Sequence, residues 1–402
     1  MQTVSVIIPL WNGEKWIRAC LSSLDGQDDG APFALEVVVV DNGSHDKSPA
    51  LVEDEFPAAR LIRNGRNLGF AGGCNVGLAA ATGGVLVLLN QDTQVRPGWL
   101  AALVAALTEP GVGVAGSLAL LADGITVQHA GGVVDWPLGV ARHLGYGERR
   151  TEPRPSGNHA QFVTGASLAL RREVLEHIGP LDEAFWPGYY EDVDFCWRAQ
   201  AAGYGVRYVP DSVLIHAESG SFTDPVYTAW ARLRGRLRFC IKHLPPQNFV
   251  DEFLPAEAAY QPTVLAGDRH GQIARAYLEA IPMLFELWQA QGETNERIAR
   301  AIHGLAQLCP PLQASPNPAR QEGTRQGSKR RGDLPGPGKP MLTPSPLDGI
   351  PLLGRLRRVL HQLVIFYSER RQRQLLAAIQ EEREYIQRLE EEIALLYKKL
   401  SN

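Results

Sequence analysis

Two groups of acidic residues stand where carboxylates could carry out chemistry. Glu191, Asp192 and Asp194 lie within four residues, at the predicted start of a helix. Far upstream, the segment 90–92 follows an apolar, strand-like run and ends in Asp92. One carboxylate that binds a metal ion and one that removes a proton are the groups that metal-assisted group transfer needs.

Each acidic group also has a purely structural interpretation. Acidic residues in the first turn of a helix complement the positive end of its dipole. Aspartate directly after a strand is also a common turn residue. Neither group decides between the two interpretations alone, so the elements that position them must be considered.

The first 109 residues alternate strand-like and helix-like segments. Continuous apolar strands that alternate with helices predict a mostly parallel sheet covered on both faces and wound with right-handed crossovers. Ligands bind such sheets beyond the carboxyl ends of the strands. Asp41 ends the second predicted strand and segment 90–92 ends the fourth, so both should face one crevice. The predicted strands are 4–10, 36–40, 59–63 and 85–89, and the predicted helices are 14–24, 49–56, 71–82 and 98–109.

The second half of the chain gives a mixed pattern. Segment 128–157 is rich in glycine and aromatic residues and predicts a loop or a hairpin. The remaining segments predict strands at 112–120, 162–170 and 206–216, a short helix at 172–179, and helices at 225–244 and 256–308.

Composition restricts the class of protein. The 402 residues are enough for two or three domains, and 45% hydrophobic residues support an ordinary core. A net charge of -4 gives no reason to expect a nucleic acid as partner. Five scattered cysteines indicate a reducing compartment and argue against disulfides or structural zinc. Neither a signal-peptide pattern nor an apolar run of about 20 residues occurs, so we expect a cytoplasmic protein.

The C-terminal part differs from the rest. Residues 310–348 combine proline, glycine and basic residues, a composition typical of a disordered linker. Residues 375–400 carry apolar residues in heptad spacing, which predicts a short coiled coil and a homodimer. Segment 350–367 is apolar with arginines, and is either a helix that packs on the catalytic domain or one that lies on the anionic inner face of the cell membrane. The expected domains are 1–245 (catalytic), 246–309 (helical extension), 310–348 (disordered linker) and 349–402 (amphipathic helix and coiled coil).

Three further features bear on the type of enzyme. Glycines at the start of the helix after Asn67 would let backbone N–H groups approach phosphates closely, although packing of helix on sheet explains them equally. The dinucleotide fingerprint G-x-G-x-x-G is missing after the first strand, which argues against a dehydrogenase.

His216 ends a predicted strand and is a candidate second metal ligand, although a lone histidine more often packs or forms hydrogen bonds.

Taken together, these motifs resemble the inverting family 2 glycosyltransferases of the GT-A fold, and most closely their rhamnosyltransferase-like branch. The resemblance covers residues 3–245 and rests on the order and spacing of the motifs. They are VSVIIPLWN at 4–12, VVVDNGS at 38–44, NLGFAGGCN at 67–75, LLNQDT at 88–93, TGA at 164–166, RR at 171–172, IG at 178–179 and GYYEDVD at 188–194.

The resemblance implies a role for each matching residue. Asp41 would bind the nucleobase, Asp92 would bind Mg²⁺ or Mn²⁺ through the donor diphosphate, with His216 as second ligand, and Asp192 beside Glu191 would be the general base. The metal motif of the family usually begins with aspartate, and Asn90 in its place implies weaker metal affinity. The donor would contact Pro9, Asn12, Asp41, Asn67, Gly69, Gly72, Asn75, Asn90, Gln91 and Asp92, and the acceptor side would be formed by Gly165, Ala166, Tyr190 and Asp194.

The expected function is therefore inverting transfer of a sugar from a nucleotide-diphosphate donor to a hydroxyl group. The family branch favours dTDP-rhamnose as donor and a polysaccharide or lipid-linked acceptor, at the inner face of the cell membrane. A catalytically inactive scaffold that assembles partners through the coiled coil is the first alternative, supported by Asn90. A nucleotidyltransferase or dinucleotide enzyme is the second, but segment 9–13 is no phosphate loop.

Overall fold

The computed structural model describes residues 2–150, 160–217, 224–265 and 272–309. The chain forms two compact units, Met1–His243 and Leu244–Asn402. The expected linker, amphipathic helix and coiled coil lie outside the described residues, and those expectations stay predictions. No helix of the described ranges is long and apolar enough to cross a membrane.

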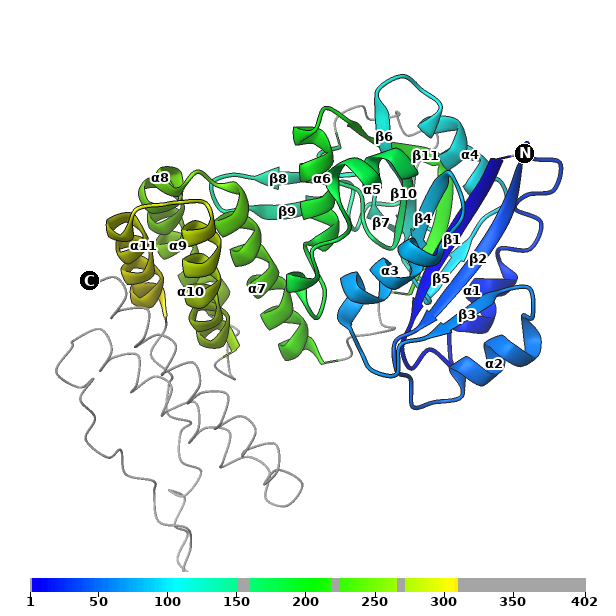
Figure 1. The fold of residues 1–402 in the computed structure, drawn as a ribbon, viewed down its shortest axis with the longest axis horizontal. Helices are drawn as coiled ribbons and strands as arrows, with labels where there is room; N and C mark the ends of the chain where they lie inside the picture. The colour runs from blue at the N-terminus through cyan, green and yellow to red at the C-terminus, as the bar shows by residue number, and fades with distance from the viewer. Residues whose placement is uncertain (1, 151–159, 218–223, 266–271, 310–402) are drawn as a thin grey trace, which may run out of the picture. The chain divides into compact units, whose positions relative to one another are not determined.

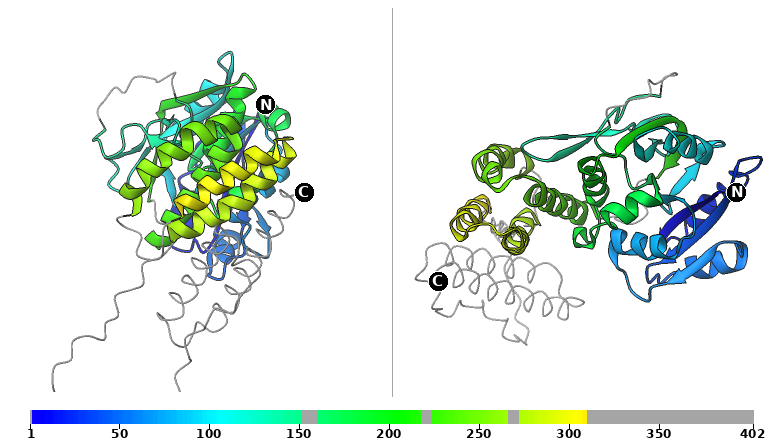
Figure 2. Two further views of the ribbon diagram at one scale, coloured as in Figure 1. Left: turned by 90° about the vertical axis from the view of Figure 1, so that its left-hand side faces the viewer. Right: turned by 45° about the horizontal axis from the view of Figure 1, so that its top comes forward.

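The first unit is built on a large mixed sheet (Figure 1). The strands are β1 (Gln2–Leu10), β2 (Phe33–Asp41), β3 (Arg60–Arg63), β4 (Val85–Leu89), β5 (Thr93–Val95), β6 (Val112–Leu120), β7 (Val127–His129), β8 (Gly132–Asp135), β9 (Val140–His143), β10 (Ser167–Arg171) and β11 (Gly205–His216). The sheet runs β3-β2-β1-β4-β10-β6-β11-β5, and β7 pairs with β6. Strands β8 and β9 form a separate antiparallel hairpin, which extends away from the main sheet (Figure 2).

Helices cover both faces of this sheet, as the apolar strands predict. The helices of the unit are α1 (Ile17–Ser22), α2 (Ser48–Glu55), α3 (Gly69–Ala80), α4 (Trp99–Leu107), α5 (Arg172–Ile178), the 3-10 turn η1 (Glu183–Phe185), α6 (Glu191–Ala201) and α7 (Pro225–His243). Residues of α1, α2 and α4 pack in one apolar cluster, and residues of α3, α5 and α6 in the other. Val38, Val39 and Val40 of β2 alternate between the two clusters, because successive side chains of a strand point to opposite faces.

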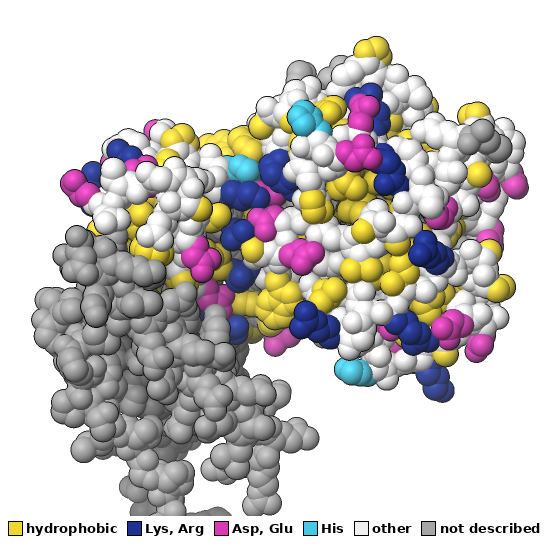
Figure 3. Space-filling view, in the orientation of Figure 1, with side chains coloured by type: hydrophobic (Ala, Val, Ile, Leu, Met, Phe, Trp, Pro, Cys, Tyr) yellow, Lys and Arg dark blue, Asp and Glu magenta, His cyan; other side chains and the backbone are white. Residues whose placement is uncertain are grey.

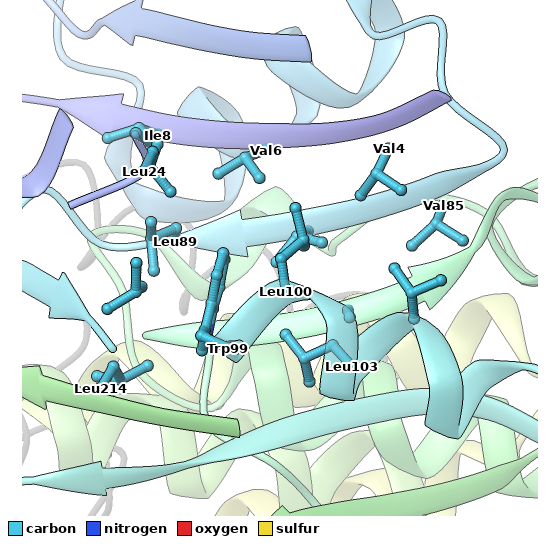
Figure 4. Close-up of a cluster of buried hydrophobic side chains, with 14 of the residues drawn as sticks. Val4, Val6, Ile8, Leu24, Val85, Leu89, Trp99, Leu100, Leu103 and Leu214 are labelled. Atoms are coloured by element: carbon cyan, nitrogen blue, oxygen red, sulfur yellow. The ribbon is translucent and has the colours of Figure 1, made fainter. Parts of the chain in front are cut away.

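Trp99 marks the centre of the first cluster (Figure 4). Its ring is fully buried, and its indole N–H donates to Ser117 Oγ at 2.9 Å and Ser167 Oγ at 3.1 Å. Ser212 Oγ donates to the Trp99 carbonyl at 3.0 Å. Since buried polar groups are costly without partners, these bonds fix how α4 packs on β6, β10 and β11.

Several elements differ from the sequence-based expectations. β10 begins at Ser167 and not at residue 162, because Phe162 bonds to Gly132 and the Gly165 N–H is used by Asp192. β10 also runs antiparallel to β4 and β6, which interrupts the expected parallel sheet. The helix expected at 14–24 begins only at Ile17, since residues 14–16 form a turn in which Gly13 O accepts from both Trp16 N and Ile17 N. Strand β5 was not predicted at all.

The second unit is helical where it is described. It contains α8 (Pro246–Asn248), the π-helical turn η2 (Phe249–Phe253), α9 (Leu254–Leu265), α10 (Gln272–Ala290) and α11 (Asn295–Leu308). The single helical segment expected at 256–308 is therefore divided. Gly292 has φ of 76° and ends the run after α10, and the Thr294 side chain accepts from Arg297 N to start α11.

Candidate active site

The predicted site residues come together because three strands run in the same direction. β1 pairs in parallel with β2 and with β4, and Leu10 of β1 lies opposite Asp41. The loops after these strands, including segment 90–92, therefore leave the sheet at one edge, as the sequence predicts.

Asp41 is buried at this edge. Its Oδ1 accepts from Ser44 N at 2.9 Å, and Arg63 Nη1 lies 3.9 Å from its Oδ2. The Ser44 contact is the turn that the sequence also allowed as the structural interpretation of Asp41. A carboxylate with one oxygen committed to the turn still has acceptor capacity for a ligand.

Asn42 organises the loops around Asp41 and was not predicted. Its amide N–H₂ donates to Asn67 Oδ1 at 3.2 Å and to the Gly69 carbonyl at 2.9 Å, while its Oδ1 accepts from Asn64 Nδ2 and Leu68 N. Asn67 Oδ1 in turn accepts from Gly69 N at 2.8 Å. The predicted donor-site residue Asn67 is thus oriented by a neighbour whose type alone gave no signal, because asparagine after a strand is a common turn residue.

The start of α3 is crowded, which explains its glycines. Gly69 has φ of 74°, and a Cβ there would lie 2.7 Å from the Trp186 ring. Gly72 is buried inside the helix. Asn75, expected on the donor side, instead bonds Leu181 through its amide N and O and also donates to Glu183. It therefore fastens α3 to the segment before α6.

The loop after β1 is tied to the loops after β2 and β4. Pro9 is the penultimate residue of β1. Asn12 has φ of 50° and accepts from His45 N at 2.8 Å.

Gln91 bonds the backbone of Trp11 twice, with its Oε1 at 2.8 Å from Trp11 N and its Nε2 at 3.1 Å from Trp11 O. Gln91 thus couples the nucleotide-side loop to the residues beside Asp92.

Asp92 and His216 lie side by side. His216 Nε2 is 3.2 Å from Asp92 Oδ1 and 3.2 Å from Asn90 Nδ2. His216 Nδ1 lies 2.8 Å from Gln128 Oε1, and because a carbonyl oxygen can only accept, Nδ1 carries the proton of that bond. In the neutral ring, the lone pair of Nε2 then accepts from Asn90 Nδ2, and the carboxylate of Asp92 lies at the same distance from Nε2.

These residues fit a divalent cation. The described residues contain no group of three or more His, Cys, Asp or Glu side chains that could hold a metal ion alone. They do offer one carboxylate, one imidazole nitrogen and the Asn90 Oδ1, which is buried without a hydrogen-bond partner in the described part of the chain. Three protein ligands of this kind suit an ion that takes its remaining ligands from a bound diphosphate.

Asp192 lies at the first turn of α6. Its Oδ2 accepts from Gly165 N at 2.8 Å and its Oδ1 from Val193 N at 2.8 Å. Burial raises the pKa of Asp192, and the two backbone N–H groups partly oppose this effect. The next residue of the Gly165 loop, Ala166, accepts at its carbonyl from Asn90 N at 3.1 Å. One short backbone segment therefore connects the carboxylate of Asp192 with the residues around Asp92.

Glu191 and Asp194 have different environments although they flank Asp192. Glu191 is buried, and burial together with the charges of Asp192 and Asp194 raises its pKa well above its usual range. Its Oε2 has no hydrogen-bond partner among the described side chains and backbone. Asp194 is fully buried against two cationic side chains, Arg198 at 2.8 Å and Lys242 at 2.7 Å, and against the His243 imidazole at 2.8 Å.

Asp194 therefore joins α6 to α7. Burial alone would raise its pKa, but the hydrogen bond from His243 and the charges of Lys242 and Arg198 lower it well below the usual range. Arg238 and Lys242 of α7 also pair with Asp182, at 2.8 and 2.9 Å. Figure 3 shows basic and acidic side chains interleaved on the face that carries α7.

Tyr190 precedes the acidic turn with a backbone that few residues adopt. Tyr189 and Tyr190 have φ of 75° and 74°. The Tyr190 hydroxyl donates to the Gly139 carbonyl at 3.0 Å and accepts from Ala141 N at 3.1 Å, which ties this loop to the β8–β9 hairpin. Consecutive left-handed residues outside glycine cost of order 1–3 kcal/mol each and concentrate at functional sites.

The sequence of the chain is similar to those of known glycosyltransferases. The family model described as Glycosyl transferase family 2 matches residues 5–179. The N-acetylglucosaminyl-diphospho-decaprenol L-rhamnosyltransferase of Mycobacterium tuberculosis is 30% identical over 214 residues, which cover 46% of this chain and 68% of that protein. The pre-mycofactocin glycosyltransferase of the same organism is 30% identical over 231 residues, 55% of this chain and 44% of that protein. The chain thus spans less than half the length of some of its curated relatives.

Solved structures give a more distant likeness. GalNAc-T7, determined with UDP, GalNAc and Mn²⁺, is 19% identical with a TM-score of 0.48, covering 70% of this chain and 54% of that one. The mannosyltransferase of Pyrobaculum calidifontis, in complex with GDP-Man and Mn²⁺, is 19% identical with a TM-score of 0.44, covering 75% and 85%. By the family model and the rhamnosyltransferase relative together, the chain belongs to glycosyl transferase family 2.

Proposed function

We propose that this protein is an inverting glycosyltransferase that moves a sugar from a nucleotide-diphosphate donor to an acceptor hydroxyl. The observation that carries the proposal is the link between two sites. Asp192, a half-buried carboxylate at a helix N-terminus, is held by Gly165, and the adjacent Ala166 holds the loop that bears Asp92. A base and a diphosphate site must be fixed relative to each other for direct displacement at one carbon.

The donor would lie along the sheet edge. Asp41 would accept hydrogen bonds from the nucleobase, and the loops that Asn12, Asn42 and Gln91 hold together would surround the nucleotide. Asp92 and His216 would hold Mg²⁺ or Mn²⁺ with the Asn90 oxygen nearby. The ion, when bound, supplies positive charge that stabilises the leaving diphosphate.

The acceptor would approach from the side of Gly165, Tyr190 and Asp192. Asp192 would remove the proton of the acceptor hydroxyl, and that oxygen would form the bond to the anomeric carbon as the bond to the diphosphate oxygen breaks. Attack from the face opposite the leaving group gives inversion. A base must be ionised before it acts, and the N–H groups of Gly165 and Val193 favour the ionised form.

We place dTDP-rhamnose first among the donors and a polysaccharide or lipid-linked hydroxyl first among the acceptors. The name of the M. tuberculosis relative specifies rhamnosyl transfer to a diphospho-decaprenol lipid. Thermal-shift measurements of the protein with a panel of nucleotide sugars and Mn²⁺ would test the donor, because the preferred donor stabilises the folded state most. A larger shift with another nucleotide sugar would replace dTDP-rhamnose.

Substitution of Asp192 by asparagine tests the reaction. We expect Asp192→Asn to fold and to bind the donor normally, and to lose about 10²- to 10⁴-fold in transfer rate, the usual contribution of a general base. Asp54→Asn on α2 is the matched control, since Asp54 is exposed and belongs to neither site. Near wild-type turnover by Asp192→Asn would contradict the assignment. Absence of transfer and of donor hydrolysis by the wild type would favour the inactive scaffold.

A further inference from the structure

Two histidines, one on β7 and one on β9, have no part in the reaction described so far. His129 ends β7 and is fully buried, whereas His143 ends β9 and is exposed. Their Nδ1 atoms are 2.7 Å apart, and their rings meet edge to face. A hydrogen bond between two imidazole nitrogens needs one donor and one acceptor, so both rings cannot be positively charged while the bond exists.

The positive charge belongs on His143. Burial lowers the pKa of His129 well below its usual range, and the charge of His143 lowers it further. His129 is therefore the neutral acceptor when His143 is protonated.

Contacts on two sides connect the hairpin that bears His143 to the segments that flank Asp192. Phe162 packs on both imidazoles, with ring centroids 5.6 Å from each, and it lies three residues before Gly165, whose N–H holds Asp192. On the other side, Ala141 of β9 donates to the Tyr190 hydroxyl, two residues before Asp192. His143 is close enough to Asp192 for its charge to lower the pKa of that carboxyl, against the larger effect of burial.

Few other charged groups among the described residues face this pair. Arg142, adjacent to His143, forms an ion pair with Asp135 on the exposed hairpin. Glu191 is the chain neighbour of Asp192, and burial raises its pKa well above the usual range. Asp194 is neutralised by the cations of α6 and α7. His143 thus remains as the charge that changes near Asp192 when the pH falls.

We propose that His143 is a positioning residue for the Asp192 carboxylate: the buried His129 holds its ring in place, and its positive charge keeps Asp192 ionised at mildly acidic pH. The inference rests on the proposed role of Asp192 as base. Imidazole ordinarily gains its proton below about pH 6.5. Burial raises the pKa of Asp192, so this carboxyl takes up its proton at higher pH than an exposed aspartate does. Without His143, Asp192 should take up its proton at higher pH, so the acidic limb of the activity profile should move upward.

The pH profile of kcat/KM tests this effect. We expect His143→Gln to lower kcat/KM about threefold to tenfold near the acidic midpoint of the wild-type profile, because the variant loses one exposed opposite charge. At higher pH, the kcat/KM of the variant should approach that of the wild type. The KM for the donor should not change, since His143 lies on the side of the base. His177→Gln is the control, because His177 is exposed on α5 and bonds to Tyr204. A His143→Gln profile that superimposes on the wild type would overturn the inference.

A titration by NMR tests the pair without activity. Coupling between charges is mutual, so the pKa of the His143 imidazole should be lower in Asp192→Asn than in the wild type. An unchanged His143 titration would overturn the proposed pairing. The two proposals fail separately: an active Asp192→Asn would refute the base, whereas an inactive Asp192→Asn with an unaltered His143 titration and pH profile would refute only the role of His143.

Discussion

His216 Nε2 lies 3.2 Å from Asp92 Oδ1, and the proton of the histidine is held on the opposite nitrogen by Gln128. In the neutral ring, a nitrogen lone pair and a carboxylate oxygen at this distance repel each other unless a positive charge lies between them. A divalent cation bound as proposed would supply that charge, and the Gln128 contact is the kind of outer hydrogen bond that orients a histidine ligand.

The first prediction from this relationship concerns Gln128. Replacement by leucine removes the acceptor that fixes the His216 tautomer while nearly preserving side-chain volume. We expect Gln128→Leu to weaken Mn²⁺ binding about 10- to 100-fold, the usual effect of losing such an outer contact. Titration calorimetry with Mn²⁺ in the presence of a nucleoside diphosphate would measure it. Asp92→Asn should weaken binding at least as much, and unchanged affinity in both variants would place the metal elsewhere.

Asn90 offers a second test of the same site. Asn90→Asp introduces a carboxylate next to Asp92, so the variant without metal should be less stable through charge repulsion. With Mn²⁺ the added anionic ligand should tighten binding, and the metal-dependent rise in Tm should exceed that of the wild type. Thermal melts with and without Mn²⁺ would measure both effects. A smaller rise in Asn90→Asp than in the wild type would mean that Asn90 does not face the ion.

Parts of this site could be predicted from the sequence because they follow from strand direction. Asp41 and Asp92 come after apolar runs that are long enough to be buried strands, and parallel neighbours bring their ends to one edge. The direction of β10 could not be predicted, because an apolar run such as 162–170 is compatible with both a parallel and an antiparallel strand. Asn42, Gln128 and His143 were missed for a related reason: each acts through a partner distant in sequence, and no spacing rule reveals such contacts.

The different environments of Asp192 and Asp194 could have been inferred from helical geometry. Residues two positions apart lie about 200° apart around a helix, so the two carboxylates point to opposite sides. Asp192 meets the Gly165 loop, whereas Asp194 is buried against α7. The helix therefore directs Asp194 away from the side of Asp192, and the expected acceptor-side role of Asp194 stays a prediction. The predicted coiled coil and membrane-binding helix stay predictions, because they lie beyond the described residues.

The ion pairs of Asp194 lead to a prediction on stability. Asp194→Asn leaves the cations of Arg198 and Lys242 and the His243 imidazole around a neutral amide, so we expect a loss of about 3–5 kcal/mol in the free energy of unfolding at pH 7. Because folding lowers the pKa of Asp194, its contribution is complete above the ordinary aspartate range and is lost as the pH falls below it. Urea unfolding at pH 7 and near pH 3 would test this, and the gap between wild type and variant should narrow at the lower pH. A gap that is constant with pH would show that the carboxylate charge is not responsible.

Gly165 gives the last prediction, because it is the donor that fixes Asp192. A Cβ at this position would lie 3.0 Å from Phe70 Cε1 and 3.6 Å from Asp192 Cβ. The Phe70 ring or the loop must then shift, and a displacement of the Gly165 N–H would move the carboxylate from its position. Since misplacement by about 1 Å can cost 10²-fold in rate, we expect Gly165→Ala to lower kcat by about 10- to 100-fold while donor binding persists. Gly84→Ala is the control, because a Cβ there meets only the Gln2 side chain at 3.4 Å or more. Equal kcat values for Gly165→Ala and Gly84→Ala would mean that the Gly165 contact does not position the base.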